Sequence, residues 1–239
     1  MLVSIFPRSL APPNERFSMP SFAQPRSMVV LLLIAVIVQW GCVPSEDGKG
    51  TESSKWGRIK IVLDPGHGGI DVGASPDGAP FEKGVVLDIA LRVERLLERK
   101  GLQVTLTRRT DEFIPLPKRA SMANDEHGTL FVSIHANSCP RKEVRGFEIY
   151  YSENGRERQS VQAANFLQQT LKKATGANDR GIRKQNYAVL ARTKCPAVLI
   201  EVGYLSNPRE ANLLSKGSYR KKVAQGIAKG IAAYAKTRL

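Results

Sequence analysis

The sequence predicts an α/β fold, in which a single domain is built on a mostly parallel twisted sheet of about six strands with helices on both faces. Strand-like and helix-like segments alternate along residues 58–236. Several strand-like runs are apolar at nearly every position, as strands are when both faces of a sheet are covered. The length of 239 residues also suits one domain of ordinary size, whereas two complete domains would be cramped.

Six runs enriched in Val, Ile and Phe are predicted as strands. In chain order, they cover residues 58–64, 103–108, 129–136, 146–152, 187–191 and 197–203. Four segments with apolar residues at helical spacing are predicted as helices, and they cover residues 85–101, 117–127, 157–175 and 218–236. Gly101 and Gly176 stand at the ends of two of these helices, where glycine is favoured.

The first 41 residues are predicted to be a signal peptide or a membrane anchor. Arg26 precedes an apolar run at residues 28–38, which is short for a membrane span but suits the apolar region of a secretory signal. Cys42 ends the sequence QWGC, which resembles the lipobox of bacterial lipoproteins, although its glutamine and tryptophan are unusual there. Lipidation at Cys42, cleavage without lipidation and an uncleaved anchor all stay open. Each implies export to the cell envelope or periplasm.

A polar segment separates this region from the predicted domain. Residues 42–56 are rich in Gly and Ser, which indicates a flexible linker, and the folded domain is predicted to cover residues 57–239. Within the domain, Cys139 follows one predicted strand and Cys195 precedes another. Because parallel strands would place these residues at opposite ends of the sheet, we expect two free thiols.

The chain is strongly basic. Lys and Arg number 36 against 22 Asp and Glu, an excess of 14 positive charges that is spread along the chain. Such a field favours an acidic polysaccharide, a nucleic acid or an anionic membrane surface as partner, although it would also serve solubility alone. No aromatic-rich basic repeat or zinc-finger spacing accompanies it, so nucleic acid is not an expected partner. We expect a monomer, with a membrane contact through the N-terminus.

Polar residues stand at the strand ends where catalytic groups collect in a parallel sheet. The first strand ends at Asp64, with His67 just beyond it, the third ends at His135 and Asn137, and the last contains Glu201. The sequence PGHGG lacks the third glycine of a dinucleotide fingerprint and the Gly-Lys-Ser or Gly-Lys-Thr of a Walker A loop, which disfavours phosphate binding there. Asp64 and Asn137 either support a site or serve only as a turn cap and a loop amide.

A metal site is one interpretation of these positions. His67 and His135 are two of only three histidines, and both stand at strand ends, whereas His127 is expected to be solvated. Hydrolytic zinc sites use three protein ligands, and two His with one Glu is a common set. Glu82 opens a predicted helix and is either a ligand or an acid that compensates the helix dipole. Glu201 interrupts an apolar strand, so it is expected to be paired, metal-bound or catalytic.

Four sequence blocks together resemble one enzyme family. They are VLDPGHGG, FEKG, SIHAN and PAVLIEVGYLSNPRE, and three further blocks agree, namely TLTRRTDEFIPLPKRASMAN, GFEIYY and RGIRKQNYAVLA. The set resembles the zinc-dependent N-acetylmuramoyl-L-alanine amidases of the amidase_3 family. The resemblance implies that His67, Glu82 and His135 bind Zn²⁺, that Glu201 is the catalytic carboxylate, and that residues 57–239 form a zinc amidase catalytic domain.

The resemblance also implies a reaction, the hydrolysis of the amide bond between N-acetylmuramic acid and L-alanine, with peptidoglycan or muropeptides as the partner. The residues alone indicate only metal-assisted hydrolysis of a polar amide or ester. A zinc peptidase acting within the stem peptide and a peptidoglycan-binding lipoprotein without activity are the alternatives. Some family members insert an autoinhibitory helix after the strand that matches GFEIYY. Here residues 152–155 lead directly into the next predicted helix, so an open site is expected.

Overall fold

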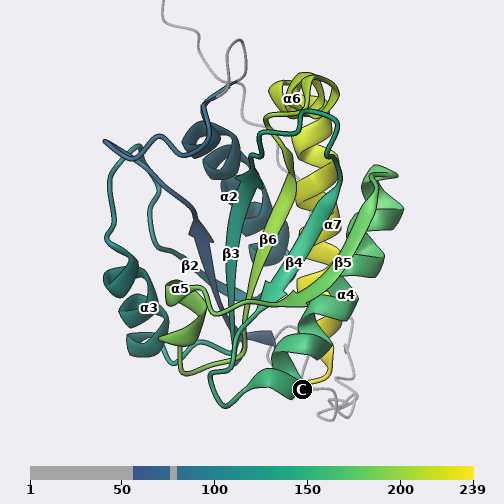
Figure 1. Ribbon diagram of the computed structural model, residues 1–239. Helices are drawn as coiled ribbons and strands as arrows, with labels where there is room; N and C mark the ends of the chain where they lie inside the picture. Colours follow the sequence, from purple (N-terminus) through teal and green to yellow (C-terminus); the bar gives the residue numbers. More distant parts are fainter. Residues whose placement is uncertain (1–55, 76–79) are drawn as a thin grey trace, which may run out of the picture. The chain divides into compact units, whose positions relative to one another are not determined.

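The computed structural model describes residues 56–75 and 80–239, which contain a six-stranded sheet in the order β2-β1-β3-β6-β4-β5 (Figure 1). The strands are β1 (Lys60–Pro65), β2 (Gln103–Leu106), β3 (Leu130–Asn137), β4 (Phe147–Tyr151), β5 (Asp179–Lys184) and β6 (Ala197–Tyr204). The helices are α2 (Glu82–Glu98), α3 (Leu116–Asp125), α4 (Glu157–Thr175), α5 (Ala188–Ala191), α6 (Pro208–Ser215) and α7 (Gly217–Lys236). Only the β4–β6 pair is antiparallel, so the predicted α/β fold with a mostly parallel sheet is confirmed.

Helices cover both faces of the sheet, as predicted, but they do so unequally (Figure 1). The long helices α2, α4 and α7 lie on one face, and their apolar sides form the larger hydrophobic cluster together with that face. The shorter helices α3 and α5 lie on the other face over a smaller cluster, which comprises Val62, Ala123, Phe131, Val189, Leu190, Ala197 and Leu199. The free energy of burial is therefore concentrated on the first face, since it grows with the apolar area removed from water.

The second face changes character along β3 and β6. Phe131 and Leu199 belong to the smaller hydrophobic cluster, but the next residues on the same face are Ser133 and Glu201. His135, one strand step further along β3, also lies on this face because side chains alternate with a period of two. This face is thus apolar towards the amino ends of the two strands and polar towards their carboxyl ends.

The predicted strand at residues 187–191 is wrong. These residues form the single-turn helix α5, and Val189 and Leu190 pack into the smaller cluster. Periodicity does not separate a short apolar run in a strand from one in a buried helical turn, which is why YAVLA was misassigned.

Two elements were not predicted. Strand β5 pairs with β4 at the edge of the sheet, and its sequence DRGIRK is too polar to show strand periodicity. Helix α6 begins with Pro208, and the side chain of Asn207 accepts hydrogen bonds from the backbone N–H groups of Arg209 and Glu210. Asparagine before a proline at the first helical position is a helix start signal, so the sequence contained the information for α6.

The ends of several helices and strands have the features that the sequence predicts. Helix α4 ends at Gly176 in the left-handed conformation, with φ of 66°, as its position in the sequence predicts. Cys139 and Cys195 are free thiols, and they follow β3 and precede the parallel strand β6, respectively. Between β4 and α4, the described residues 152–156 contain no helix.

The N-terminal predictions largely fall outside the described residues. The proposed signal or anchor at residues 1–41 and all of the linker except Trp56 are not covered, and Trp56 is only 6% exposed within the hydrophobic core. None of the helices in residues 56–75 and 80–239 has the length and apolar character to cross a membrane.

Candidate active site

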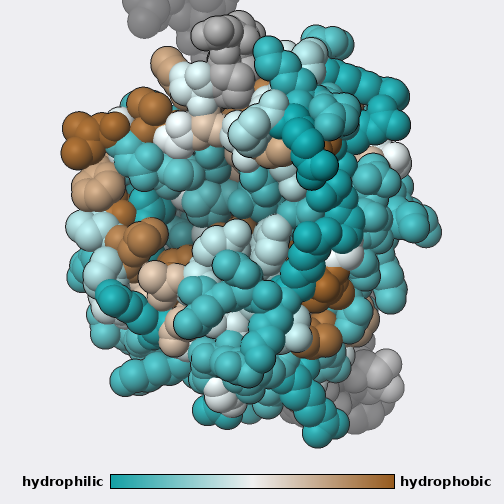
Figure 2. Space-filling view, viewed as in Figure 1, coloured by the Kyte–Doolittle hydropathy of each residue, from teal (hydrophilic) through white to brown (hydrophobic). Residues whose placement is uncertain are grey.

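Three of the four residues singled out from the sequence lie at the carboxyl ends of the central strands, and the fourth lies at the start of a helix. His67 follows β1, His135 lies in β3, Glu201 lies in β6 and Glu82 is the first residue of α2. His135 and Glu201 are Cα partners in the β3–β6 pair, so their side chains leave the same face of the sheet. Helices α3 and α5 lie over the other half of this face, and the surface in this view is mainly hydrophilic (Figures 1 and 2).

Three of these side chains form a compact group. One ligand atom each from His67, Glu82 and His135 lies within 4.8 Å of the other two. Glu82 Oε1 is 3.1 Å from Nε2 of His67 and 3.0 Å from Nδ1 of His135. Two ligands of tetrahedral zinc stand about 3.4 Å apart, because each lies about 2.1 Å from the metal. The two distances to Glu82 are close to this spacing, and the three side chains offer the donor atoms of a zinc site.

Glu82 is held through both carboxylate oxygens. Its Oε2 accepts a hydrogen bond from the backbone N–H of Ala74 at 2.8 Å, and its Oε1 accepts one from Ala136 at 2.9 Å. Burial raises the pKa of Glu82, but hydrogen bonds from His135 and His67 outweigh burial and hold the pKa well below its ordinary value. An ionised carboxylate thus lies between two imidazoles, an arrangement that a bound cation would stabilise.

His67 is oriented by its own loop. Its backbone has φ of 58°, which is uncommon for a residue with a side chain and costs about 1–3 kcal/mol. Two backbone hydrogen bonds between Gly68 and Asp71, at 2.7 and 3.1 Å, close the turn that follows. Asp71 Oδ1 lies 2.8 Å from Nδ1 of His67, and this contact directs Nε2 towards Glu82.

The His67 ring contacts Asp71 and Glu82, and Asp64 is not among its hydrogen-bond partners. Asp64 accepts hydrogen bonds in a buried network, from Arg119 at 2.8 Å, Thr107 at 2.6 Å and Ser133 at 2.7 Å. Arg119 also donates to the carbonyl oxygen of His67 at 2.7 Å. Asp64 therefore supports the loop indirectly, while Asp71 makes the contact with the ring.

Asn137 and His127, the two remaining polar candidates, lie outside the group of candidate ligands. The side-chain oxygen of Asn137 accepts a hydrogen bond from the backbone N–H of Ser138 at 2.7 Å, which makes it a loop amide. His127 is exposed beyond the end of α3, as expected from its polar neighbours.

Two glycines leave the space that the side chains of His135 and Glu82 occupy. A Cβ atom on Gly66 would lie 2.2 Å from Cε1 of His135, and a Cβ atom on Gly73 would lie 2.6 Å from Oε2 of Glu82. Gly73 also has φ of 66°, which favours glycine. Gly66 therefore makes room for the ring of His135.

Glu201 is a buried acid with an unpartnered oxygen. It is 9% exposed, and its Oε2 has no hydrogen-bond partner among the described residues. Burial raises the pKa of Glu201 to about 7. A carboxyl group with a pKa near neutrality can both accept and return a proton at neutral pH, which is what general acid–base catalysis requires.

The sequence profile of the family Amidase_3, described as N-acetylmuramoyl-L-alanine amidase, matches residues 61–233. The chain belongs to the Amidase_3 family. The matched segment begins in β1 and ends in α7, so it contains every strand and helix described above except Lys60 of β1 and the last residues of α7.

Solved Amidase_3 structures agree in fold. The catalytic domain of CwlV, an N-acetylmuramoyl-L-alanine amidase from Bacillus (Paenibacillus) polymyxa var. colistinus, is 41% identical, with a TM-score of 0.70 over 74% of this chain and 98% of that one. AmiC2 of Nostoc punctiforme is 37% identical, with a TM-score of 0.71 over 75% of this chain and 98% of that one. CwlD of Clostridioides difficile, solved in complex with the GerS lipoprotein, is 31% identical, with a TM-score of 0.71 over 75% and 99% of the two chains.

Curated relatives are longer than the matched part of this chain. The probable cell wall amidase LytH of Staphylococcus aureus is 37% identical over 177 residues, which are 73% of this chain and 57% of the relative. The chain thus spans somewhat more than half of the length of the relatives it matches.

A second acidic group beside Glu201 was not predicted from the sequence. Glu148 of β4 is the Cα partner of Glu201, is 1% exposed, and pairs with the guanidinium of Arg180 and the hydroxyl of Tyr150. Burial raises the pKa of Glu148, but the hydrogen bonds from Tyr150 and Arg180 outweigh it and lower the pKa below its ordinary value. Glu148 therefore stays ionised next to Glu201. The argument that singled out Glu201, an acid within an apolar strand, applies equally to Glu148.

Proposed function

We propose that this chain is a zinc-dependent N-acetylmuramoyl-L-alanine amidase, which hydrolyses the bond between N-acetylmuramic acid and L-alanine and releases stem peptides from peptidoglycan. The observation that carries the proposal is the place of Glu201, a buried and unpartnered carboxylate on the strand beside His135. A compact group of two histidines and one glutamate next to such an acid supports metal-assisted hydrolysis. Membership of the family supports the choice of substrate.

His67, Glu82 and His135 would hold the Zn²⁺ ion and leave one position open. Bound zinc supplies Lewis acidity, which polarises an amide carbonyl and lowers the pKa of water towards about 7. The surrounding residues fix the ligands, because Asp71 restrains the His67 ring and the backbone N–H groups of Ala74 and Ala136 hold Glu82.

Glu201 would act as the general base and then as the general acid. Its unpartnered Oε2 can accept a proton from the attacking water, and the same carboxyl group can then donate that proton to the leaving nitrogen of L-alanine. Burial keeps the pKa of Glu201 at about 7, so neither transfer requires a large change in free energy near neutral pH. Ionised Glu148 beside it disfavours a second negative charge and helps to keep the pKa raised.

The proposed location is the cell envelope or periplasm. Residues 1–41 would act as a cleaved signal or as a membrane anchor, with Cys42 as the site of lipidation and residues 42–56 as the linker to the catalytic domain. The net charge of +14 favours approach to an anionic wall and to the carboxylates of muropeptides. Mass spectrometry of the mature N-terminus distinguishes an acylated Cys42 from a cleaved, unmodified one and from an intact anchor.

Digestion of purified muropeptides tests the reaction. We expect the full chain to release intact stem peptides and free glycan in the presence of zinc, without an added activator protein. Shortened stem peptides that remain attached to muramic acid would show a peptidase instead. If the wild type binds peptidoglycan and releases no product under any metal condition, the protein is a binding lipoprotein without activity.

The metal assignment is tested separately. Metal analysis of the purified His67→Ala protein should show a large loss of zinc relative to the wild type, because one of three protein ligands is removed. The matched control is His127→Ala, since His127 is exposed and lies at the opposite edge of the sheet. Full retention of zinc in His67→Ala would show that the ligand set is wrong.

A further inference from the structure

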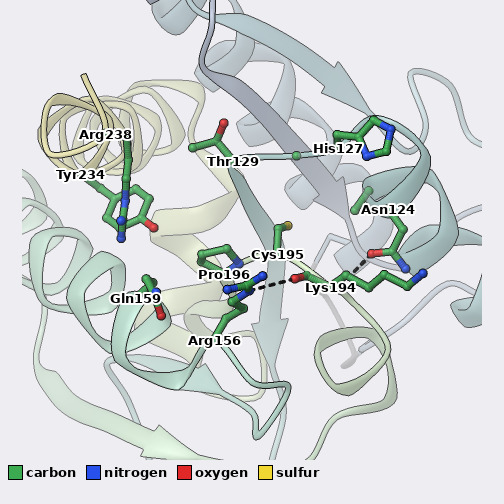
Figure 3. A pocket seen from close by; sticks show the side chains of 12 residues that line it. Asn124, His127, Thr129, Arg156, Gln159, Lys194, Cys195, Pro196, Tyr234 and Arg238 are labelled. Atoms are coloured by element: carbon green, nitrogen blue, oxygen red, sulfur yellow. Dashed lines mark hydrogen bonds between the residues drawn. The ribbon is translucent and has the colours of Figure 1, made fainter.

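A hollow of about 440 Å³ lies at the edge of the sheet opposite the candidate active site (Figure 3). Its lining includes Thr129 just before β3, Pro196 just before β6, Arg156 at the start of α4, and Tyr234 and Arg238 at the end of α7. His135 is six positions after Thr129, which corresponds to about 20 Å along an extended strand. The hollow is therefore distinct from the metal group.

The lining carries positive charge without compensating acids. None of the twelve described residues that form it is acidic, whereas Arg156, Lys194 and Arg238 are basic. The guanidinium of Arg238 lies 4.8 Å from the ring centre of Tyr234, and that of Arg156 donates a long hydrogen bond of 3.4 Å to the carbonyl of Lys194. Among the described residues, neither arginine forms an ion pair.

The hydroxyl group of Tyr234 is a second feature of the hollow that points to a ligand, independent of the positive charge. Tyr234 is 0% exposed, and its hydroxyl has no hydrogen-bond partner among the described residues. Figure 3 shows the hydroxyl directed into the hollow, between α7 and the residues that precede β6. A buried hydroxyl without a partner is unfavourable, and the other such side-chain atom in the described residues is Oε2 of Glu201 in the candidate active site.

No side chain in the lining carries a negative charge that would repel an anion. Burial raises the pKa of Cys195 to about 11 and also raises the pKa of Tyr234, so both side chains are neutral at neutral pH. The hydroxyl groups of Thr129 and Tyr234 can donate hydrogen bonds, and the two arginines add guanidinium N–H donors. Such a set matches a group with three or more acceptor oxygens and a negative charge better than a carboxylate, which has two oxygens.

We propose that this hollow is a binding site for a phosphate ester. The volume exceeds that of a phosphate group alone and leaves room for a small alcohol portion such as glycerol. The hollow lies at the amino-terminal edge of the sheet, where Thr129 is hydrogen-bonded to Lys60 at the start of β1. The described domain begins at this edge, after the segment predicted to carry a membrane anchor, so a phospholipid head group and a soluble phosphate ester are the two sources to distinguish.

Calorimetric titration of the full chain, kept in a maltoside detergent, tests the site with glycerol 3-phosphate and with acetate as the comparison anion. We expect glycerol 3-phosphate to bind and acetate to bind at least about fivefold more weakly, because acetate offers fewer acceptor oxygens. Arg238→Gln and Arg156→Gln should each weaken glycerol 3-phosphate about tenfold, as loss of one charge-assisted hydrogen bond does. Arg158→Gln, an exposed basic residue of α4 outside the lining, is the matched control and should bind like the wild type.

Tyr234→Phe separates a ligand-binding role from a structural one. Without ligand its melting temperature should equal or exceed that of the wild type, because the hydroxyl has no partner to lose. Its affinity for glycerol 3-phosphate should fall about threefold to tenfold. The rise in melting temperature that the phosphate ester causes in the wild type should shrink accordingly.

Binding to vesicles with and without phosphatidylglycerol shows whether the bound phosphate ester belongs to a lipid head group or to a soluble molecule. Binding of the soluble ester that the arginine variants weaken supports a site for free phosphate esters. Binding only to phosphatidylglycerol vesicles, weakened by the same variants and retained in Arg158→Gln, supports the phosphate of a lipid head group. Failure to bind either probe, or equal binding by the wild type and the two arginine variants, would overturn the proposal without touching the amidase assignment.

Discussion

The two faces of the sheet are built from the same strands but contain different chemistry. On the face covered by α2, α4 and α7, the residues of β3 and β6 are apolar from one end to the other. On the face covered by α3 and α5, they are apolar near the amino ends and polar near the carboxyl ends, where Ser133, His135 and Glu201 replace the apolar residues. Stability and the proposed catalysis are thus divided between the two faces of single strands, and neighbouring residues in the sequence should respond to substitution in opposite ways.

The largest effect is expected at Glu201. Glu201→Gln removes the proposed proton-transfer group while keeping its size, so amidase activity should fall about 10²-fold to 10⁴-fold. Rates of release of stem peptides from muropeptides provide the measurement. In the metal-free protein at pH 8, the midpoint of urea unfolding should stay the same or rise, since a buried carboxylate without a partner on Oε2 is replaced by a neutral amide. A strongly destabilised variant would contradict the division between the faces.

Asp64 tests whether all polar residues of the second face belong to catalysis. Asp64→Ala leaves Arg119 buried without its acidic partner, and Arg119 is only 2% exposed. Breaking a buried pair in this way costs about 3–5 kcal/mol of unfolding free energy. Denaturant unfolding of Asp64→Ala and Asp64→Asn should show the larger loss for alanine, because asparagine can still accept a hydrogen bond. If both variants are as stable as the wild type, this network does not stabilise the fold.

Ile200 is the neighbour of Glu201 in the sequence but points to the other face. Its side chain is fully buried in the larger cluster, and Ile200→Ala should cost about 2–5 kcal/mol of unfolding free energy. The zinc content per folded molecule should stay unchanged, because no ligand residue lies on that face. Loss of zinc from the folded Ile200→Ala protein would mean that the two faces are coupled more tightly than the packing indicates.

The smallest expected effect is a pH dependence. General-base catalysis requires the ionised form of Glu201, whose pKa burial raises to about 7. Activity should therefore fall as the pH drops through this value, by about tenfold for each further unit, as the protonated fraction grows. A bound cation would shift this limb to lower pH, because positive charge favours the carboxylate. Rate profiles from pH 4 to 9 provide the test, and the absence of an acid limb over that whole range would contradict the assignment of Glu201 as the general base.

Three of the four candidate active-site residues, His67, His135 and Glu201, were conspicuous in the sequence because they conflict with their surroundings. Glu82 was not, since an acid at a helix start is ordinary, and its assignment came from the family resemblance. A histidine at a strand end or an acid in an apolar strand is conspicuous in a single sequence, and the matching strand ends suggested that they meet. The contact between Asp71 and His67 could not be predicted in this way, since it depends on a left-handed backbone at His67 and a turn closed by only two hydrogen bonds. The role of Gly66 likewise depends on how closely β1 and β3 approach.

Prediction of the fold failed where the sequence pattern is weakest. Strand β5 lies at the edge of the sheet, where half-exposed residues need not be apolar, and its charged sequence resembles a loop. Helix α5 has only four residues, and no periodicity can be detected over a single turn. The long helices and the central strands were found because many buried positions repeat the same pattern.

The space left by Gly66 has a consequence for how inactive descendants of such an enzyme would arise. One base change in a glycine codon gives alanine, whose methyl group would meet the His135 ring at 2.2 Å. Such a lineage would lose the metal geometry while every acid and histidine of the site remained in its genome. A survey of related sequences that counts only His67, Glu82, His135 and Glu201 would therefore classify an inactive descendant as active. The residue at position 66 distinguishes the inactive sequence from the active one.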